Sequence, residues 1–218
     1  MMKILCVGYR KWALNIYNKL AQNYNDGDIF IIENYNAYSD SLVESYNPDF
    51  ILFYGWSWVI NKEIVNNYKC IMLHPSKLPK YRGGSPIQNQ IIRDERDSAV
   101  TLFLMNDNMD SGPILFQESM SLSGTIGDIF DRIESLGYKG TIKFFNNPSD
   151  GISQIEDDAT YFKRRTEGQS EITLKELKER SSIYIYNKIR MLQDPYPNAY
   201  FRTYDGKKIV LKSVEIED

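Results

Sequence analysis

Histidine and cysteine are scarce in this chain, whose 218 residues include one histidine and two cysteines. Zinc sites usually take three or four ligands of those types, so this chain could build one only with help from carboxylates, and we expect no metal. Two cysteines are also too few for a secreted fold held together by disulfides. Cys6 and Cys70 lie in apolar, strand-like runs, and we expect them to be small buried thiols in a reduced cytoplasm.

The chain also lacks long apolar runs and an excess of positive charge. Its first apolar run, residues 4–7, is too short for the core of a signal peptide, and no stretch approaches the length of a membrane span. Its 29 acidic residues outnumber the 26 basic ones, which gives a formal net charge of −3 and does not favour a general nucleic-acid binder. We therefore expect a cytoplasmic protein that partners neither membranes nor nucleic acids.

Short apolar runs alternate with amphipathic segments in the first half of the chain. This alternation is typical of an α/β fold with a mostly parallel sheet flanked by helices and right-handed crossovers. Ligands of such open sheets gather at the carboxyl ends of the strands. The predicted strands are residues 3–8, 28–33, 50–54 and 70–73, and the predicted helices are residues 11–23, 40–46 and 61–68.

The rest of the chain predicts three more helices and two pairs of strands. Gly137 or Gly140 is expected to weaken the longest helix, and Asp205-Gly206 is a strong hairpin turn. The predicted elements are a loop at 74–84, a helix at 85–95, strands at 99–105 and 114–120 around a polar turn at 106–112, a helix at 125–145, a linker at 146–154, a helix at 174–192, and hairpin strands at 199–204 and 208–216.

The turn after the first predicted strand lies where nucleotide folds place a phosphate loop. Its sequence, residues 8–11, lacks the G-x-G-x-x-G pattern, so a dinucleotide cofactor is not supported. Arg10 and Lys11 could be solvated cations of an ordinary strand–helix turn. Alternatively, they and the helix N-terminus could hold an anion such as a phosphate.

The single histidine heads the most informative segment of the chain. His74 directly follows a predicted buried strand, and two prolines and two glycines then fix an irregular polar loop. An imidazole in that position favours a functional role over plain packing. A second segment carries Asp107 and Asp110, which could be turn formers or could hold a catalytic imidazole.

These two segments together follow the pattern of a known family. The loop supplies His74, Ser76, Leu78, Pro79, Arg82 and Gly83, and Asp110-Ser111-Gly112 follows the histidine at a spacing of 110 − 74 = 36 residues. They resemble the tetrahydrofolate-dependent formyltransferases, whose pattern is Asn-x-His-x-Ser-x-Leu-Pro, then Arg-Gly, then Asp-x-Gly. The resemblance extends from about residue 2 to residue 165.

The resemblance implies a Rossmann-like catalytic core at residues 1–165 that moves a formyl group from 10-formyltetrahydrofolate, as co-substrate and without a metal, to an amine. His74 would stabilise the negative charge on the formyl oxygen and relay protons. Asp110 would orient His74 or hold the water that carries the proton. Residues 54–60 resemble the segment whose backbone receives the pterin ring. The implied folate-binding residues are Gly55, Trp56, Ser57, Trp58, Ile60 and Asp107.

One position departs from the family pattern. The asparagine two residues before the histidine would fall at position 72, where this chain has Met72, which cannot donate a hydrogen bond. Losing a donor to the developing oxyanion is expected to lower the rate on the order of a hundredfold. The candidates to replace it are Ser76, Gln88, Asn89 and protonated His74.

The tail bears on which amine is formylated. Residues 166–218 are expected to form a short helix-plus-hairpin extension, without the barrel that grips tRNA in methionyl-tRNA formyltransferases. Residues 194–201 resemble a Pro-Tyr-Pro motif shared by tRNA and sugar formyltransferases. The length therefore favours sugar-nucleotide N-formyltransferases, which act on UDP- or dTDP-linked amino-deoxysugars in glycan biosynthesis. The loop residues most resemble enzymes of pseudaminic-acid-type pathways.

The candidate residues for binding this nucleotide sugar are Arg10, Lys77, Tyr81, Arg82 and Gln88. Surface cations are more often solvated than ligands, and Lys77 is favoured because its loop is held beside His74. Two other functions stay open: formylation of an aminoacyl group on tRNA or on a carrier protein, and a non-catalytic homologue that binds folate or a nucleotide. A homodimer stays open as well.

Overall fold

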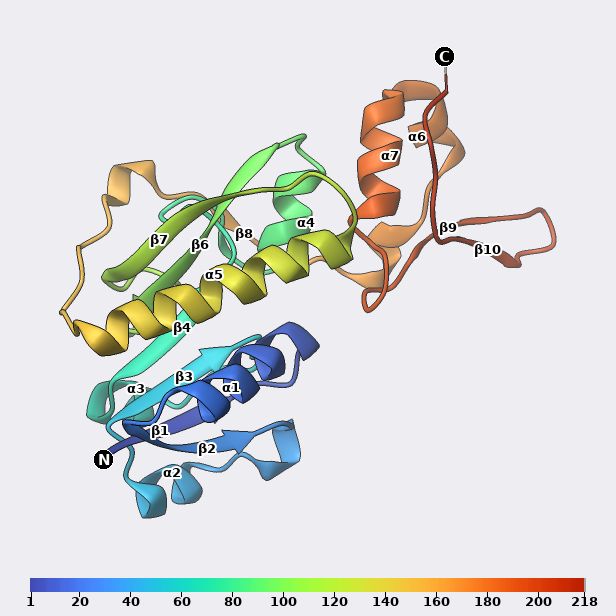
Figure 1. The fold of residues 1–218 in the computed structure, drawn as a ribbon. Helices are drawn as coiled ribbons and strands as arrows, with labels where there is room; N and C mark the ends of the chain where they lie inside the picture. Colours follow the sequence, from blue (N-terminus) through green and yellow to red (C-terminus); the bar gives the residue numbers. More distant parts are fainter. Residues whose placement is uncertain (218) are drawn as a thin grey trace.

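A six-stranded sheet forms the centre of the computed structural model, which describes residues 1–217. The strand order is β2-β1-β3-β4-β6-β7, in which the first four strands are parallel and the last two are antiparallel to their neighbours. This confirms the predicted mostly parallel α/β fold (Figure 1). The strands are β1 Met2–Val7, β2 Gly27–Ile32, β3 Phe50–Tyr54, β4 Cys70–His74, β6 Asp97–Leu104 and β7 Ile114–Ser121.

Helices cover both faces of the sheet, so the central strands are apolar on both sides. On one face, α1 (Lys11–Asn23) and α5 (Ile126–Asn146) share a core cluster with strand residues such as Ile4, Leu52 and Leu73. On the other face, α2 (Asp40–Tyr46) and α3 (Lys62–Asn67) pack on residues such as Leu5 and Phe53. This layering leaves the loops at the ends of the strands free to build a site.

The helix expected at 125–145 is α5, which runs unbroken for 21 residues through both glycines. A Cβ at Gly137 would lie 2.6 Å from a methyl carbon of Leu73 and 2.7 Å from one of Ile16. A Cβ at Gly140 would lie 2.5 Å from the ring of Phe116. The two glycines therefore let the helix approach the sheet and α1 closely.

Two other predicted helices differ from the structure. The helix expected at 85–95 is α4, Pro86–Ile91, and turns follow it up to Asp94, whose φ is 59°. The single helix expected at 174–192 is two helices, α6 Leu174–Glu179 and α7 Ser182–Arg190. The break lies at Ser181, whose side chain accepts a hydrogen bond from the backbone amide of Tyr184 and caps the second helix.

The remaining elements are short. Two small sheets accompany the central one, a parallel pair of β5 with β8 and the predicted hairpin of β9 with β10, whose strands are shorter than expected. The bounds are β5 Arg82–Gly83, β8 Tyr161–Phe162, β9 Ala199–Arg202, β10 Lys208–Leu211, and the 3₁₀ turns η1 Tyr35–Ala37, η2 Glu156–Asp158 and η3 Glu167–Ser170.

The tail packs against the core at the α4 side (Figure 1). Its buried residues Ile172, Ile189 and Met191 belong to the same apolar cluster as α1 and α5. The Asn187 side chain also donates a hydrogen bond to Asp94, 3.1 Å away, beyond the end of α4. Among residues 1–217, no helix is long and apolar enough to cross a membrane.

Candidate active site

Two adjoining cavities meet at the histidine loop and the aspartate turn. The larger has a volume of about 830 Å³ and the smaller about 310 Å³. His74 lines the larger cavity, Asp107 lines the smaller, and Asp110 lines both. The residues common to both walls are Trp58, Val59, Met72, Met109 and Asp110. A group bound in one cavity can therefore reach a group bound in the other at this junction.

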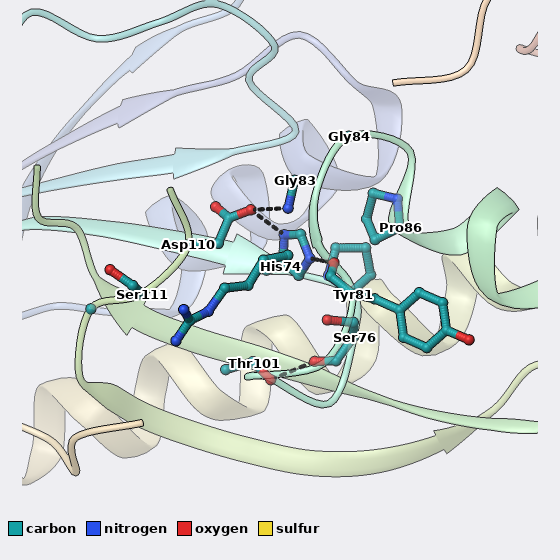
Figure 2. Close-up of polar contacts among 12 residues, drawn as sticks. His74, Ser76, Tyr81, Gly83, Gly84, Pro86, Thr101, Asp110 and Ser111 are labelled. Atoms are coloured by element: carbon teal, nitrogen blue, oxygen red, sulfur yellow. Dashed lines mark hydrogen bonds and ion pairs between the residues drawn. The ribbon is translucent and has the colours of Figure 1, made fainter. Parts of the chain in front are cut away.

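His74 is buried at the end of β4 with both ring nitrogens near oxygen atoms (Figure 2). Its Nε2 lies 2.8 Å from the carbonyl oxygen of Tyr81. A carbonyl only accepts hydrogen bonds, so Nε2 carries the proton in this contact. Its Nδ1 lies 3.6 Å from Oδ2 of Asp110, an ion-pair distance when the imidazole is protonated. Nδ1 is thus the nitrogen that can accept or release a proton in the site.

Asp110 is held from two sides. Its Oδ2 accepts a hydrogen bond of 2.7 Å from the backbone amide of Gly83, and its own carbonyl accepts one of 2.9 Å from Nε2 of Gln154. Its φ of 50° is left-handed, a backbone conformation that non-glycine residues adopt only where the surroundings enforce it. The structure therefore brings together the two predicted catalytic residues, with the carboxylate directed toward the imidazole.

Two glycines let this loop pack against a distant segment of the chain. A Cβ at Gly83, whose φ is 97°, would lie 2.4 Å from the carbonyl oxygen of Phe162. A Cβ at Gly84 would lie 2.4 Å from the backbone nitrogen of Arg164. This close approach places the basic residues 163–165 on the wall of the larger cavity.

The predicted folate-binding residues divide between the cavities. Gly55, Trp56 and Ser57 line the larger cavity, Ile60 and Asp107 line the smaller, and Trp58 lines both. Trp56 and Trp58 also form an aromatic cluster with Tyr9 and Tyr35. The sequence does not predict this cluster, because its members come from loops after three different strands. Its closest ring-centroid distances are 4.6 Å for Tyr35–Trp58, 4.8 Å for Trp56–Trp58 and 5.0 Å for Tyr9–Trp58.

Of the five predicted substrate-binding residues, only two line a cavity. Arg10 and Gln88 lie on the wall of the larger one, and the Arg10 guanidinium lies 4.8 Å from the ring centroid of Tyr9 and 5.4 Å from that of Tyr196. Tyr196 and Pro197, from the predicted Pro-Tyr-Pro motif, complete this wall.

The other three predicted substrate-binding residues do not line either cavity. Lys77 is exposed outside both. Tyr81 donates its hydroxyl to Glu95 over 2.8 Å, and burial together with that carboxylate raises its pKa to about 12. Arg82 is fully buried and ion-paired with Glu156 at 2.8 Å, so its guanidinium is not available to a substrate.

Two of the candidates to replace the family asparagine are already engaged. Ser76 donates its hydroxyl to the carbonyl of Lys80, and the Asn89 amide donates to the carbonyls of Gly84 and Lys163. The Gln88 amide nitrogen is buried and has no partner. Because Met72 lines both cavities and cannot donate, Gln88 and protonated His74 are left as candidate donors.

Three buried nitrogen atoms of the larger cavity's residues have no hydrogen-bond partner in the described chain. They are Nε1 of Trp56, Nε2 of Gln88 and Nε of Arg165. All three are donors, and burial lowers the pKa of Arg165 from its usual value. An unpaired buried donor is costly, and these three atoms belong to residues that line the larger cavity. Arg10, Lys163 and Arg164 add positive charge to the same wall.

No group of three or more histidine, cysteine or acidic side chains that could hold a metal is present within residues 1–217. Both cysteines are buried free thiols, as predicted, and burial raises the pKa of Cys70 to about 12.

Comparisons with known proteins agree on the fold. Residues 5–144 match the sequence model of a family described as formyl transferase. A methionyl-tRNA formyltransferase from Rickettsia africae (strain ESF-5) is 32% identical over 183 residues, which cover 81% of this chain, and the chain spans 58% of that relative's length.

Two solved structures also align with nearly the whole chain. The methionyl-tRNA formyltransferase from Clostridium thermocellum has a TM-score of 0.84 and 30% identity, over 96% of this chain and 97% of that one. A 4-N formyltransferase from Francisella tularensis has a TM-score of 0.77 and 20% identity, over 100% of this chain and 98% of that one. At that identity the second structure supports the fold alone.

Proposed function

The chain belongs to the formyl transferase family, and from this premise we propose that it transfers a formyl group from 10-formyltetrahydrofolate to the amine of a nucleotide-linked amino-deoxysugar. UDP or dTDP is the proposed nucleotide. The narrower proposal is a UDP-linked 4-amino sugar of the kind made in pseudaminic-acid-type pathways, for glycan biosynthesis in the cytoplasm.

The observation that carries the choice of acceptor is the polar wall of the larger cavity. Its basic residues Arg10, Lys163, Arg164 and Arg165 favour a ligand that carries negative charge and hydrogen-bond acceptors. A nucleoside diphosphate supplies both, through its phosphate oxygens and the carbonyls of a pyrimidine base. The aromatic cluster beside this wall adds ring faces on which a base or a sugar can stack.

The junction of the cavities supports the chemistry. The smaller cavity, with Ile60 and Asp107 on its wall, is the proposed place of the pterin ring, and the amine would enter from the larger one. The neutral amine attacks the formyl carbon, a new C–N bond forms, and the bond from that carbon to N10 of the folate breaks. The products are a formamido sugar and tetrahydrofolate.

His74 would move the proton in this reaction. Its Nε2 proton is held by the Tyr81 carbonyl, so Nδ1 accepts the proton that the attacking amine loses and returns it to N10. Asp110, 3.6 Å from Nδ1, stabilises the imidazolium between these two steps. As imidazolium, His74 also stabilises negative charge on the formyl oxygen.

We also propose a division of labour along the chain. Residues 1–165 would form the catalytic core, and residues 166–218 would complete the acceptor wall through Tyr196 and Pro197. The tail is thereby proposed as part of the acceptor site rather than as an independent unit.

Formylation of methionyl-tRNA is the second candidate, because the relatives with 30–32% identity carry that name. The two are separated by incubating the purified protein with 10-formyltetrahydrofolate and, in parallel, UDP-amino sugars, dTDP-amino sugars and methionyl-tRNA. Mass spectrometry then detects the added formyl group. A formamido nucleotide sugar is the expected product. Formylation of methionyl-tRNA alone would show that methionyl-tRNA, and not a nucleotide sugar, is the acceptor. Binding of folate without transfer to any acceptor would indicate the non-catalytic homologue.

A further inference from the structure

Arg82 is the largest fully buried side chain of the described chain, and its guanidinium is saturated with acceptors. Nε and Nη2 donate to Oε1 of Gln154 over 3.2 and 2.8 Å, and Nη1 and Nη2 donate to the Glu156 carboxylate over 2.8 Å each. Nη1 also donates to the Tyr161 hydroxyl over 2.6 Å. The hydrogen bonds to Glu156 outweigh desolvation and raise the pKa of Arg82. Such a side chain holds structure rather than ligand.

The backbone on either side of Arg82 contacts both proposed catalytic residues. The carbonyl of Tyr81 accepts the Nε2 proton of His74, and the amide of Gly83 donates to Oδ2 of Asp110 (Figure 2). Residue 82 is therefore the centre of a three-residue stretch that fixes the imidazole at one end and the carboxylate at the other. Its side chain anchors that stretch to residues 154–161.

Gln154 extends the same network to the aspartate turn. Its Oε1 faces Arg82, so its amide nitrogen faces the other way, and it donates to the carbonyls of Asp110 over 2.9 Å and Gly112 over 2.7 Å. These bonds hold Asp110 in its left-handed backbone conformation, which non-glycine residues adopt only where the surroundings support it. One guanidinium thus supports both the Gly83 amide, which binds the Asp110 carboxylate, and the Gln154 amide, which binds the Asp110 backbone carbonyl.

We propose that Arg82 is a positioning residue that, with Gln154, holds His74 as its Nε2–H tautomer with Nδ1 directed at Asp110. The effect on turnover rests on the proposed formyl transfer, whereas the state of the imidazole does not. Lysine cannot replace this arginine, because its single ammonium cannot bridge three acceptors that a planar fork reaches together. Arg82→Lys therefore tests the role best, because it keeps the positive charge and removes the planar guanidinium.

The single histidine makes the state of the imidazole directly measurable. In protein with ¹⁵N-labelled imidazole and no histidine tag, every ring nitrogen resonance comes from His74. The parent is expected to show one neutral tautomer, with the proton on Nε2. Arg82→Lys is expected to give a mixture of tautomers and a kcat lowered about tenfold to a hundredfold, with folate binding changed less than about twofold.

Gln154→Glu is the companion variant, because its carboxylate still accepts from Arg82, whereas it cannot donate to the two carbonyls of the aspartate turn and places a negative charge beside them. It is expected to disturb the tautomer in the same direction, and it decides the question if Arg82→Lys fails to fold by circular dichroism. Lys80→Gln, at an exposed residue of the same loop, is the control and should match the parent. A single parental tautomer and parental kcat in folded Arg82→Lys and Gln154→Glu would overturn the proposal. If the variants shift the tautomer but the parent itself transfers no formyl group, the positioning role stands and the proposed function fails.

Discussion

Met72→Asn tests how the negative charge that develops on the formyl oxygen is stabilised. Met72 precedes His74 by two residues on β4, so the two side chains leave the strand on the same face, and Met72 lines both cavities at their junction. Its thioether has no proton to donate. An asparagine there would bring an amide N–H to the junction from the same strand.

The expected gain in kcat is large, whereas the expected loss of folding stability is small. A well-placed oxyanion donor changes kcat by about 10² to 10³, equivalent to about 3–4 kcal/mol, and this is the upper limit if no other donor acts now. Met72 is only partly buried against the apolar cluster around Leu5 and Phe53, so replacing it removes about 1–2 kcal/mol of burial. Since domains of this kind retain about 5–15 kcal/mol, the variant should fold.

The assay compares three substitutions at one position. Met72→Asn is expected to raise kcat for formyl transfer about tenfold to a hundredfold. Aspartate has nearly the same shape as asparagine, but its carboxylate only accepts hydrogen bonds. Met72→Asp should therefore be slower than the parent. Met72→Leu carries no polar atom and should remain within about threefold of the parent. Thermal unfolding of each variant separates stability from rate.

A folded Met72→Asn that is no faster than Met72→Leu would refute the idea that position 72 lacks a needed donor. Gln88→Leu then becomes informative, because the Gln88 amide nitrogen is an unpaired donor in a residue that lines the larger cavity. If Gln88 already serves the oxyanion, that change should lower kcat about a hundredfold. Unchanged rates in both Met72→Asn and Gln88→Leu would contradict the placement of the oxyanion at this junction.

Three further outcomes are expected. His74→Gln should lower kcat by about 10² to 10⁴ with folate binding retained, and a rate within tenfold of the parent would contradict its proton-transfer role. Gly112→Ala should lower the free energy of unfolding by about 3 kcal/mol in urea titration, because the new Cβ would lie 1.6 Å from the Leu104 carbonyl oxygen. Burial raises the pKa of Glu176, but hydrogen bonds from Lys188 and the Thr173 amide outweigh it and leave that pKa below 4.5. This pair should therefore stabilise the fold above about pH 4.5 and lose its contribution as the pH falls further, so the Tm values of parent and Glu176→Gln should converge in acid.

Local patterns predict the core elements closely. Helices 11–23 and 40–46 and the strand at 50–54 match the structure to the residue. The first helix has a regular apolar stripe, and the second begins at a serine, Ser39, whose side chain accepts from the amide of Leu42. The same kind of cap at Ser181 was overlooked, which is why one helix was expected where two exist.

Long-range contacts explain where the predicted site fails. An arginine in a polar loop gives no local indication that it is buried, and the partners of Arg82 lie 72, 74 and 79 residues away. Gln154 was assigned to a linker for the same reason, since its bonds join residues more than 40 positions apart. The pairing of His74 with Asp110 was predictable only because a family pattern carries it.

The walls of the two cavities are built from different stretches of the chain. Every described residue that lines the smaller cavity lies between Trp58 and Asp110, whereas the larger cavity also draws on residues 161–165 and on Tyr196 and Pro197. Under the proposed function, changes at residues 161–165, 196 and 197 would alter the acceptor wall and leave the smaller cavity, the proposed pterin site, unchanged. If the proposed function holds, exchanging such tails between related chains would change the formylated acceptor and leave the one-carbon donor the same.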